Sequence, residues 1–200
     1  MFDVESIIQV TGLIGVAAII FAESGLFFGF FFPGDSLLFT AGFLASQGLV
    51  PISPLVFLAI IAAILGDSVG YWFGRKIGSM IFTRPNSWWF SQKRIEDAHI
   101  FFEKYGPKSI ILARFIPAVR TFTPILAGVG QMQYRKFLVY NMIGGLLWAG
   151  VLPLAGYFLG ATVPGADHYV TSIVGVIIAL SLFPIVLSAA RQWCAKRKHQ

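Results

Sequence analysis

Residues 110 to 127 read Ile110-Ile-Leu-Ala-Arg-Phe-Ile-Pro-Ala-Val-Arg-Thr-Phe-Thr-Pro-Ile-Leu-Ala127, an apolar run in which Arg114 and Arg120 flank Pro117. Placing an arginine at the centre of a membrane helix costs about 2.5–3.5 kcal/mol. Two arginines beside a proline therefore need buried partners, serve a function, or both. The run predicts a membrane protein with a polar site in its interior.

The composition of the whole chain supports this class. Its 200 residues are 56% hydrophobic and 12% charged, whereas an ordinary soluble domain carries about 25% charged residues. The mean hydropathy is +0.76, and the length suits one membrane domain over residues 1–200. A single cysteine, Cys194, excludes an intrachain disulfide, and the three histidines lack metal-ligand spacing. We expect no metal and no cofactor and, because the N-terminus is acidic, no cleavable signal peptide.

The net charge of +6 is distributed as in a membrane protein rather than a nucleic-acid-binding one. No lysine or arginine precedes Arg75, and none lies between Lys136 and Arg191. The positive-inside rule places the three basic segments, 75–108, 135–136 and 191–198, in the cytoplasm. Both termini are therefore predicted to be cytoplasmic, and the basic tail would attract anionic lipid headgroups.

The first half of the chain predicts a crossing helix and then a hairpin. Ile7–Ala22 is apolar and suited to crossing. Beyond Glu23, the pair Pro33-Gly34 should break any helix, because proline removes a backbone donor and glycine costs helical order. Each limb around the break has about 9–10 residues, or about 14 Å, which is half of a bilayer core of about 30 Å. We predict a re-entrant hairpin that ends near Ala45.

Three further segments complete the predicted topology. Pro54–Phe73 and Phe137–Gly160 are apolar and long enough to cross. A second hairpin starts at Lys108, breaks around Pro117 and ends at Gly130. Residues 169–190 form the last span, before the basic tail at 191–200.

Residues 88–105 have apolar and charged side chains on opposite faces at helical spacing. Trp88, Trp89 and Phe90 would anchor such a helix at the cytoplasmic membrane surface. The alternative is an amphipathic helix that packs on the helix bundle.

Matched glycines relate the two halves. Ala41-Gly42 is followed by a Gly-x-x-x-Gly pair at Gly70, and Ala127-Gly128 is followed by a pair at Gly156 with the same spacing. The first repeat covers about 24–74 and the second about 108–160, with the cytoplasmic amphipathic segment 75–107 between them. Because positive charge places the hairpins on opposite sides, the repeat is inverted, an arrangement that places transporter sites at the repeat interface.

The expected fold is thus an all-α integral membrane protein: an inverted-repeat bundle with two facing re-entrant helical hairpins and about four membrane-crossing helices. The candidate site residues are the ionisable ones in or near the apolar spans, namely Glu23, Asp35, Asp67, Arg114 and Arg120. One interpretation is that they form ion pairs that hold the hairpins together. The other is that the two arginines bind a phosphate while Glu23 or Asp35 carries a proton.

Several neighbours have supporting roles in this prediction. Pro33, Gly34 and Pro117 shape the breaks, and Asp67 either supports the arginines or is a polar packing residue. Asn141 is expected to satisfy carbonyls freed at a broken hairpin. Trp148 and the paired glycines are assigned to packing.

Four motifs occur along the chain: Glu23-Ser-Gly with Phe-Pro-Gly-Asp35-Ser-Leu-Leu; Gly-Asp67 with Gly-Tyr71 and Gly-Arg75; Ala-Arg-Phe-Ile-Pro117-Ala-Val-Arg120 with Ala127-Gly128; and Asn141 with Gly-Gly-Leu-Leu-Trp148. Together they resemble the bacterial DedA family, also called SNARE-associated or VTT-domain proteins.

The resemblance implies a multi-pass protein of the bacterial inner (plasma) membrane with two facing re-entrant hairpins. It also implies a link to envelope integrity, proton motive force and resistance to cationic peptides. Some members resemble transporters of undecaprenyl phosphate or phosphatidylethanolamine, and eukaryotic relatives resemble lipid scramblases. By position, the family's functional acids match Glu23 and Asp35, and its functional arginines match Arg114 and Arg120.

We therefore expect a proton-coupled transporter, or flippase, of an anionic-headgroup lipid, with membrane lipids and protons as its partners. Two alternatives remain open: a proton-coupled small-ion or solute antiporter, and a scaffold for membrane-protein assembly. An enzyme is not expected, because the chain lacks a nucleophile elbow, a metal cluster and a Walker loop.

Overall fold

The computed structural model describes residues 4–25, 34–83 and 104–162, and all its regular elements in these ranges are α-helices. The all-α class is therefore confirmed for this part of the chain. The helices are α1 (Val4–Gly25), α2 (Gly34–Ser46), α3 (Ile52–Thr83), α5 (Lys108–Ala113), α6 (Pro117–Val129) and α7 (Tyr134–Thr162).

Two helices are long and apolar enough to cross a membrane, and they coincide with two of the predicted spans. Ile52–Gly78 within α3 has 27 such residues and α7 has 29, or about 40 Å each against a hydrocarbon core of about 30 Å. α3 extends further than predicted, to Thr83. The basic residues after Phe73 favour a helix as well as apolar ones do, and the next proline in the sequence is Pro85.

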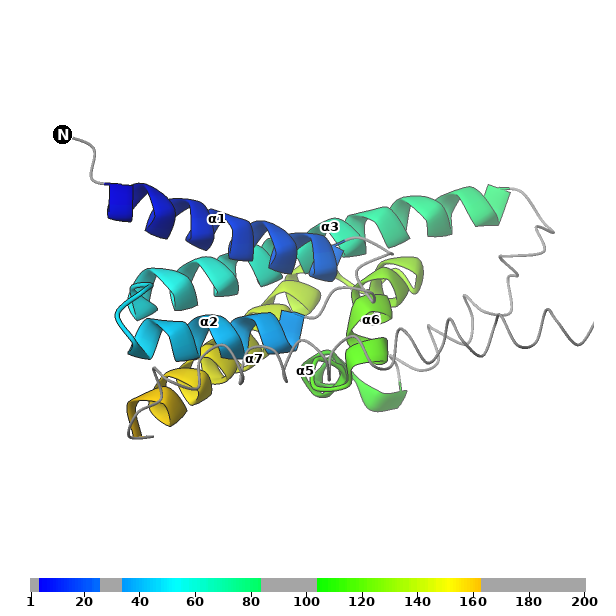
Figure 1. Cartoon of the computed structure of the whole chain (residues 1–200). Helices are drawn as coiled ribbons and strands as arrows, with labels where there is room; N and C mark the ends of the chain where they lie inside the picture. Colours follow the sequence, from blue (N-terminus) through cyan, green and yellow to red (C-terminus); the bar gives the residue numbers. More distant parts are fainter. Residues whose placement is uncertain (1–3, 26–33, 84–103, 163–200) are drawn as a thin grey trace, which may run out of the picture.

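These two long helices form the centre of the bundle (Figure 1). α1 and α6 pack on α3, α2 packs on α7, and α3 also contacts α7. Small and branched residues fill the junction of α1, α2, α3 and α7, among them Ile20, Leu38, Ala63 and Ala149. Large apolar side chains such as Phe57 and Phe158 are exposed on the outside, as expected for a surface that faces lipid rather than water.

Glycines bring the packed helices into backbone contact. At the closest of these contacts a Cβ would overlap a carbonyl oxygen of the facing helix, as for Gly42 on Pro153, Gly156 on Phe39, Gly128 on Tyr71 and Gly74 on Ile125. The packing role assigned to the paired glycines is confirmed. The two contacts resemble each other, since α2 meets α7 and α6 meets α3 through glycines on both helices.

The second hairpin has the predicted break. α5 ends at Ala113 and α6 begins at Pro117, with Ile116 in an extended conformation (φ −113°, ψ 106°). A residue before proline is pushed out of the helical region, whereas proline itself suits the first helical position. The helix–break–helix geometry is thus confirmed, while its re-entrant course in a membrane stays a prediction.

The first hairpin is described only from its break onward, where α2 begins at Gly34 as expected. Its first limb, most of the amphipathic segment and the last span with its basic tail lie outside the described residues.

Candidate functional site

Arg120 is the meeting point of three helices. It projects from α6, and its Nη1 lies 2.5 Å from Oδ1 of Asp35 in the first turn of α2. Its Nη2 pairs with Oε1 of Glu23, near the end of α1. The sequence left open which arginine Asp35 would face, and the structure places it on Arg120. Two carboxylates from separate helices therefore hold one guanidinium.

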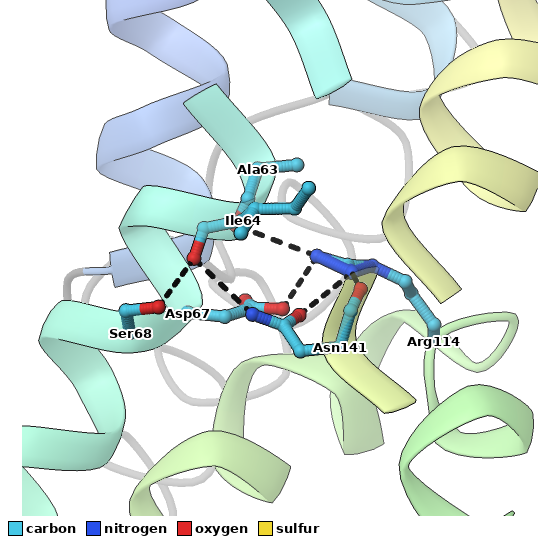
Figure 2. Close-up of polar contacts among 6 residues, drawn as sticks. All are labelled: Ala63, Ile64, Asp67, Ser68, Arg114 and Asn141. Carbon is cyan, nitrogen blue, oxygen red and sulfur yellow. Dashed lines mark hydrogen bonds and ion pairs between the residues drawn. The ribbon is translucent and has the colours of Figure 1, made fainter. Parts of the chain in front are cut away.

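Arg114 belongs to a separate network that Figure 2 shows. Its Nη2 donates to Oδ2 of Asp67 and, at 3.4 Å, to the carbonyl of Ala63, both on α3. Its Nη1 donates to the side-chain oxygen of Asn141 at 3.0 Å and to that residue's carbonyl at 3.2 Å. Arg114 thus ties the end of α5 to both central helices.

Asn141 differs from its predicted role. Its Nδ2 donates at 3.1 Å to the carbonyl of Ile64 on α3, which also accepts a 2.8 Å bond from Ser68 (Figure 2). The amide therefore serves the central helix rather than carbonyls freed at a hairpin break. The physical reason is that Arg114 occupies the amide oxygen, so the amide nitrogen turns toward the adjacent α3.

The two arginines differ in their exposure and in the number of acceptors that they contact. The Arg114 side chain is 5% exposed and donates to four acceptors. The Arg120 side chain is 13% exposed, and its partner Asp35 is 41% exposed. An incoming anion would therefore meet Arg120 and Asp35 more readily than Arg114.

Trp148 joins the two networks. Its Nε1 donates a 2.7 Å hydrogen bond to Asp35 Oδ1, and its ring centroid lies 4.5 Å from Cζ of Arg120 and 5.8 Å from Cζ of Arg114. Packing alone therefore does not describe this residue. A sequence signal existed: Asn141, Gly144 and Trp148 recur at helical spacing, which puts them on one face of α7.

The glycines on that face leave room for the Arg114 side chain. A Cβ at Gly144 would lie 3.3 Å from Cδ of Arg114, and one at Gly145 would lie 3.2 Å from its Nη1. Any larger side chain would crowd the guanidinium.

A small, partly open cavity lies between the two networks, with a volume of about 10 Å³, which is room for about one water molecule. Two hydroxyl residues in its wall, Ser24 and Thr123, were not singled out by the sequence. Thr123 donates to the carbonyl of Val119 at 2.7 Å, which leaves its oxygen able to accept a bond. The wall is formed by Ser24, Asp67, Ile110, Arg114, Arg120, Thr123, Pro124 and Trp148.

Glu23 is the most confined of the acids. It is 2% exposed, and its Oε2 has no hydrogen-bond partner among the described residues. A Cβ at Gly34 would overlap this carboxylate, so the predicted break glycine makes room for Glu23.

The formal charges of the site do not cancel. Three carboxylates, those of Glu23, Asp35 and Asp67, face the guanidinium groups of Arg114 and Arg120. With every group ionised, the cluster therefore carries one net negative charge.

Long apolar helices around buried ion pairs are typical of an α-helical membrane protein. Residues 32–158 match the VTT domain. Protein DedA of Escherichia coli K12 is 47% identical over 175 residues, which cover 86% of this chain and 80% of that protein. The chain belongs to the DedA family of VTT-domain membrane proteins.

Two further relatives agree with this class. The Mycobacterium leprae "uncharacterized membrane protein ML0287" is 45% identical over 171 residues, covering 86% of this chain and 76% of that protein. The E. coli K12 "inner membrane protein YqjA" is 36% identical over 172 residues, covering 84% and 75%. No solved structure matches the chain.

Proposed function

We propose that this protein moves a lipid with an anionic headgroup, either undecaprenyl phosphate or a glycerophospholipid, between the leaflets of the bacterial inner membrane, driven by protons. One observation carries the proposal: Arg120 lines a cavity while two carboxylates hold it in the place that a phosphate would take. Guanidinium binds phosphate and carboxylate with the same forked geometry. A phosphate can therefore replace a carboxylate on Arg120.

The net charge of the cluster supports proton coupling. An anion that enters a site with one net negative charge is repelled. If Glu23 or Asp35 first takes up a proton, the five ionisable residues become neutral in sum, and a carboxylic acid competes less strongly for Arg120. Substrate and proton would then bind together.

The two arginines have different roles in this proposal. Arg120 contacts the phosphate, with Ser24 and Thr123 available as hydroxyl partners in the cavity wall. Arg114 contributes positive potential from the opposite wall, while Asp67 and Asn141 keep it in place.

The similar glycine contacts support a two-fold relation between the halves. In transporters built from inverted repeats, the halves exchange conformations and expose the site alternately to each side. The cavity lies where both halves contribute residues, as such a mechanism requires.

The test is headgroup flipping in proteoliposomes of the purified protein, with short-chain labelled undecaprenyl phosphate and phosphatidylethanolamine, with and without a pH gradient. We expect gradient-dependent flipping of the parent, loss in Arg120→Ala, and flipping that no longer responds to the gradient in Glu23→Gln. Arg135→Ala, which changes an exposed arginine outside the cavity, is the matched control.

Parental rates in well-expressed Arg120→Ala would rule out the proposed anion contact. If neither lipid moves but a pH gradient drives ion or solute flux, the antiporter is favoured. If nothing moves, the scaffold role is favoured.

A further inference from the structure

Trp148 contacts both members of the Asp35–Arg120 ion pair. Its N–H and Arg120 Nη1 donate to the same oxygen, Oδ1 of Asp35, at 2.7 and 2.5 Å. Its ring covers the Arg120 guanidinium at 4.5 Å, a cation–π contact. One side chain thus binds the acid through its edge and the base through its face.

An anion that takes the place of a carboxylate on Arg120 would displace Asp35 more readily than Glu23, because Asp35 is the more exposed of the two. Its side chain is 41% exposed, whereas that of Glu23 is 3% exposed and is confined by Gly34. Asp35 also has a second donor in Trp148. If Asp35 leaves Arg120, its carboxylate therefore still has a hydrogen-bond donor.

We propose that Trp148 is a positioning residue that keeps Asp35 when an anion takes Arg120, while its ring face holds the guanidinium in place. This inference rests on the proposed function, since it assumes that Arg120 binds the headgroup.

The charged groups around Asp35 come from several helices. Glu23 on α1 and Arg120 on α6 form its ion-pair cluster. Arg114 lies 5.8 Å from the same indole ring and is paired with Asp67 on α3. From α7 the contact is the uncharged indole, so removal of its N–H changes the hold on Asp35 without changing any formal charge.

The experiment measures binding of dodecyl phosphate to the purified full-length protein in a neutral detergent at about pH 8, where a free carboxyl group is ionised. Trp148→Phe keeps a ring face and removes the N–H. We expect binding about tenfold weaker than in the parent, because Asp35 loses its second donor and stays on Arg120.

Two variants complete the design. Trp148→His keeps a ring N–H and should recover part of the binding that is lost in Trp148→Phe. Trp72→Phe is the control, because Trp72 is exposed and does not line the cavity; it should bind as the parent does.

A parent-like Trp148→Phe, or a Trp148→His protein that binds no better than Trp148→Phe, would overturn this inference while leaving the proposed function intact. A parent that binds no dodecyl phosphate would overturn the proposed function and this inference with it.

If Trp148→Phe does not fold, Asp35→Asn decides. We expect tighter binding than in the parent at about pH 8, because Glu23 is then the one carboxylate that competes for Arg120. Weaker binding would show that Asp35 is not the displaced group.

Discussion

Arg114 and Arg120 are neighbours in one motif, yet their surroundings give them opposite properties. The acceptors of Arg114 lie on α3 and α7, the two helices that form the centre of the bundle. The acceptors of Arg120 lie at the end of α1 and the start of α2, beside the cavity. The first arginine is therefore part of the framework, and the second is the one that we propose to contact a ligand.

Removal of Arg114 should cost stability. Arg114→Gln would leave the Asp67 carboxylate buried without its ion pair, a change that typically costs about 3–5 kcal/mol. We expect a lower unfolding temperature and less folded protein after solubilisation, measured by thermal unfolding and size-exclusion chromatography. Adding Asp67→Asn should restore part of the stability, because no unpaired charge then remains. Unchanged unfolding of the single variant would contradict the framework role.

The sequence predicted the charged residues of the site better than their partners. Glu23, Asp35 and Arg120 stand out because charge is rare in apolar segments, and a single chain shows that directly. Ser24 and Thr123 do not stand out, since small hydroxyl residues are common in membrane helices and become site residues only through the fold.

At the scale of helices, local sequence decides where a helix begins and ends, and glycine decides how closely two helices approach. Pro117 starts α6 and forces the extended residue before it. Gly128 lets α6 approach the carbonyl of Tyr71 on α3. Proline acts on its own chain neighbours, which makes the break predictable, whereas the partner of a glycine lies elsewhere in the sequence.

The close approach of α6 gives a second prediction. In Gly128→Ala the new Cβ would overlap the Tyr71 carbonyl, so α6 must move away from α3, at an expected cost of about 1–3 kcal/mol. Gly15→Ala is the control, because a Cβ there meets open space. Thermal unfolding of the two purified variants should show a loss for Gly128→Ala alone. Equal stability would mean that this interface tolerates a wider separation.

At the scale of the molecule, the two halves pack in the same manner but in different registers. Gly156 on α7 contacts the carbonyl of Phe39 on α2. In the other half Gly70 corresponds to Gly156 and Ile125 corresponds to Phe39, so identical packing would place Gly70 against Ile125. Instead Gly74, one turn further along α3, contacts Ile125. Two other matched pairs show the same one-turn difference: Gly42 on Pro153 against Gly128 on Tyr71, and Gly160 on Phe43 against Gly78 on Val129.

If the halves exchange conformations, α6 should move by one turn so that Ile125 faces Gly70. Gly70→Ala is then expected to fold normally, because its Cβ would make an ordinary contact 3.4 Å from Pro124. Flipping should nevertheless fall several-fold, because the second register is blocked. Gly74→Ala should instead lower the unfolding temperature, as its Cβ overlaps the Ile125 carbonyl here.

Flipping rates in proteoliposomes and thermal unfolding separate the two variants. A folded Gly70→Ala protein that flips lipid at the parental rate would exclude the register exchange.

The predicted topology can be tested with the native thiol. The positive-inside rule predicts that the tail that contains Cys194 is cytoplasmic. In intact cells Cys194 should resist a membrane-impermeant maleimide and should react after permeabilisation. Residues 163–168 contain no lysine or arginine and are predicted to form an external turn. A protein with Cys194→Ser and His168→Cys should therefore show the opposite pattern. Labelling of Cys194 in intact cells would reverse the orientation.

The sequence by itself determined the membrane class, the long helices, the break at Pro117 and the charged residues of the site. These follow from hydropathy and from the backbone limits of proline and glycine, which act over a few neighbouring residues. Only the tertiary structure decided that Asp35 pairs with Arg120 rather than Arg114, and that Trp148 belongs to the site. Pairing depends on which helix ends meet, and those ends lie far apart along the chain.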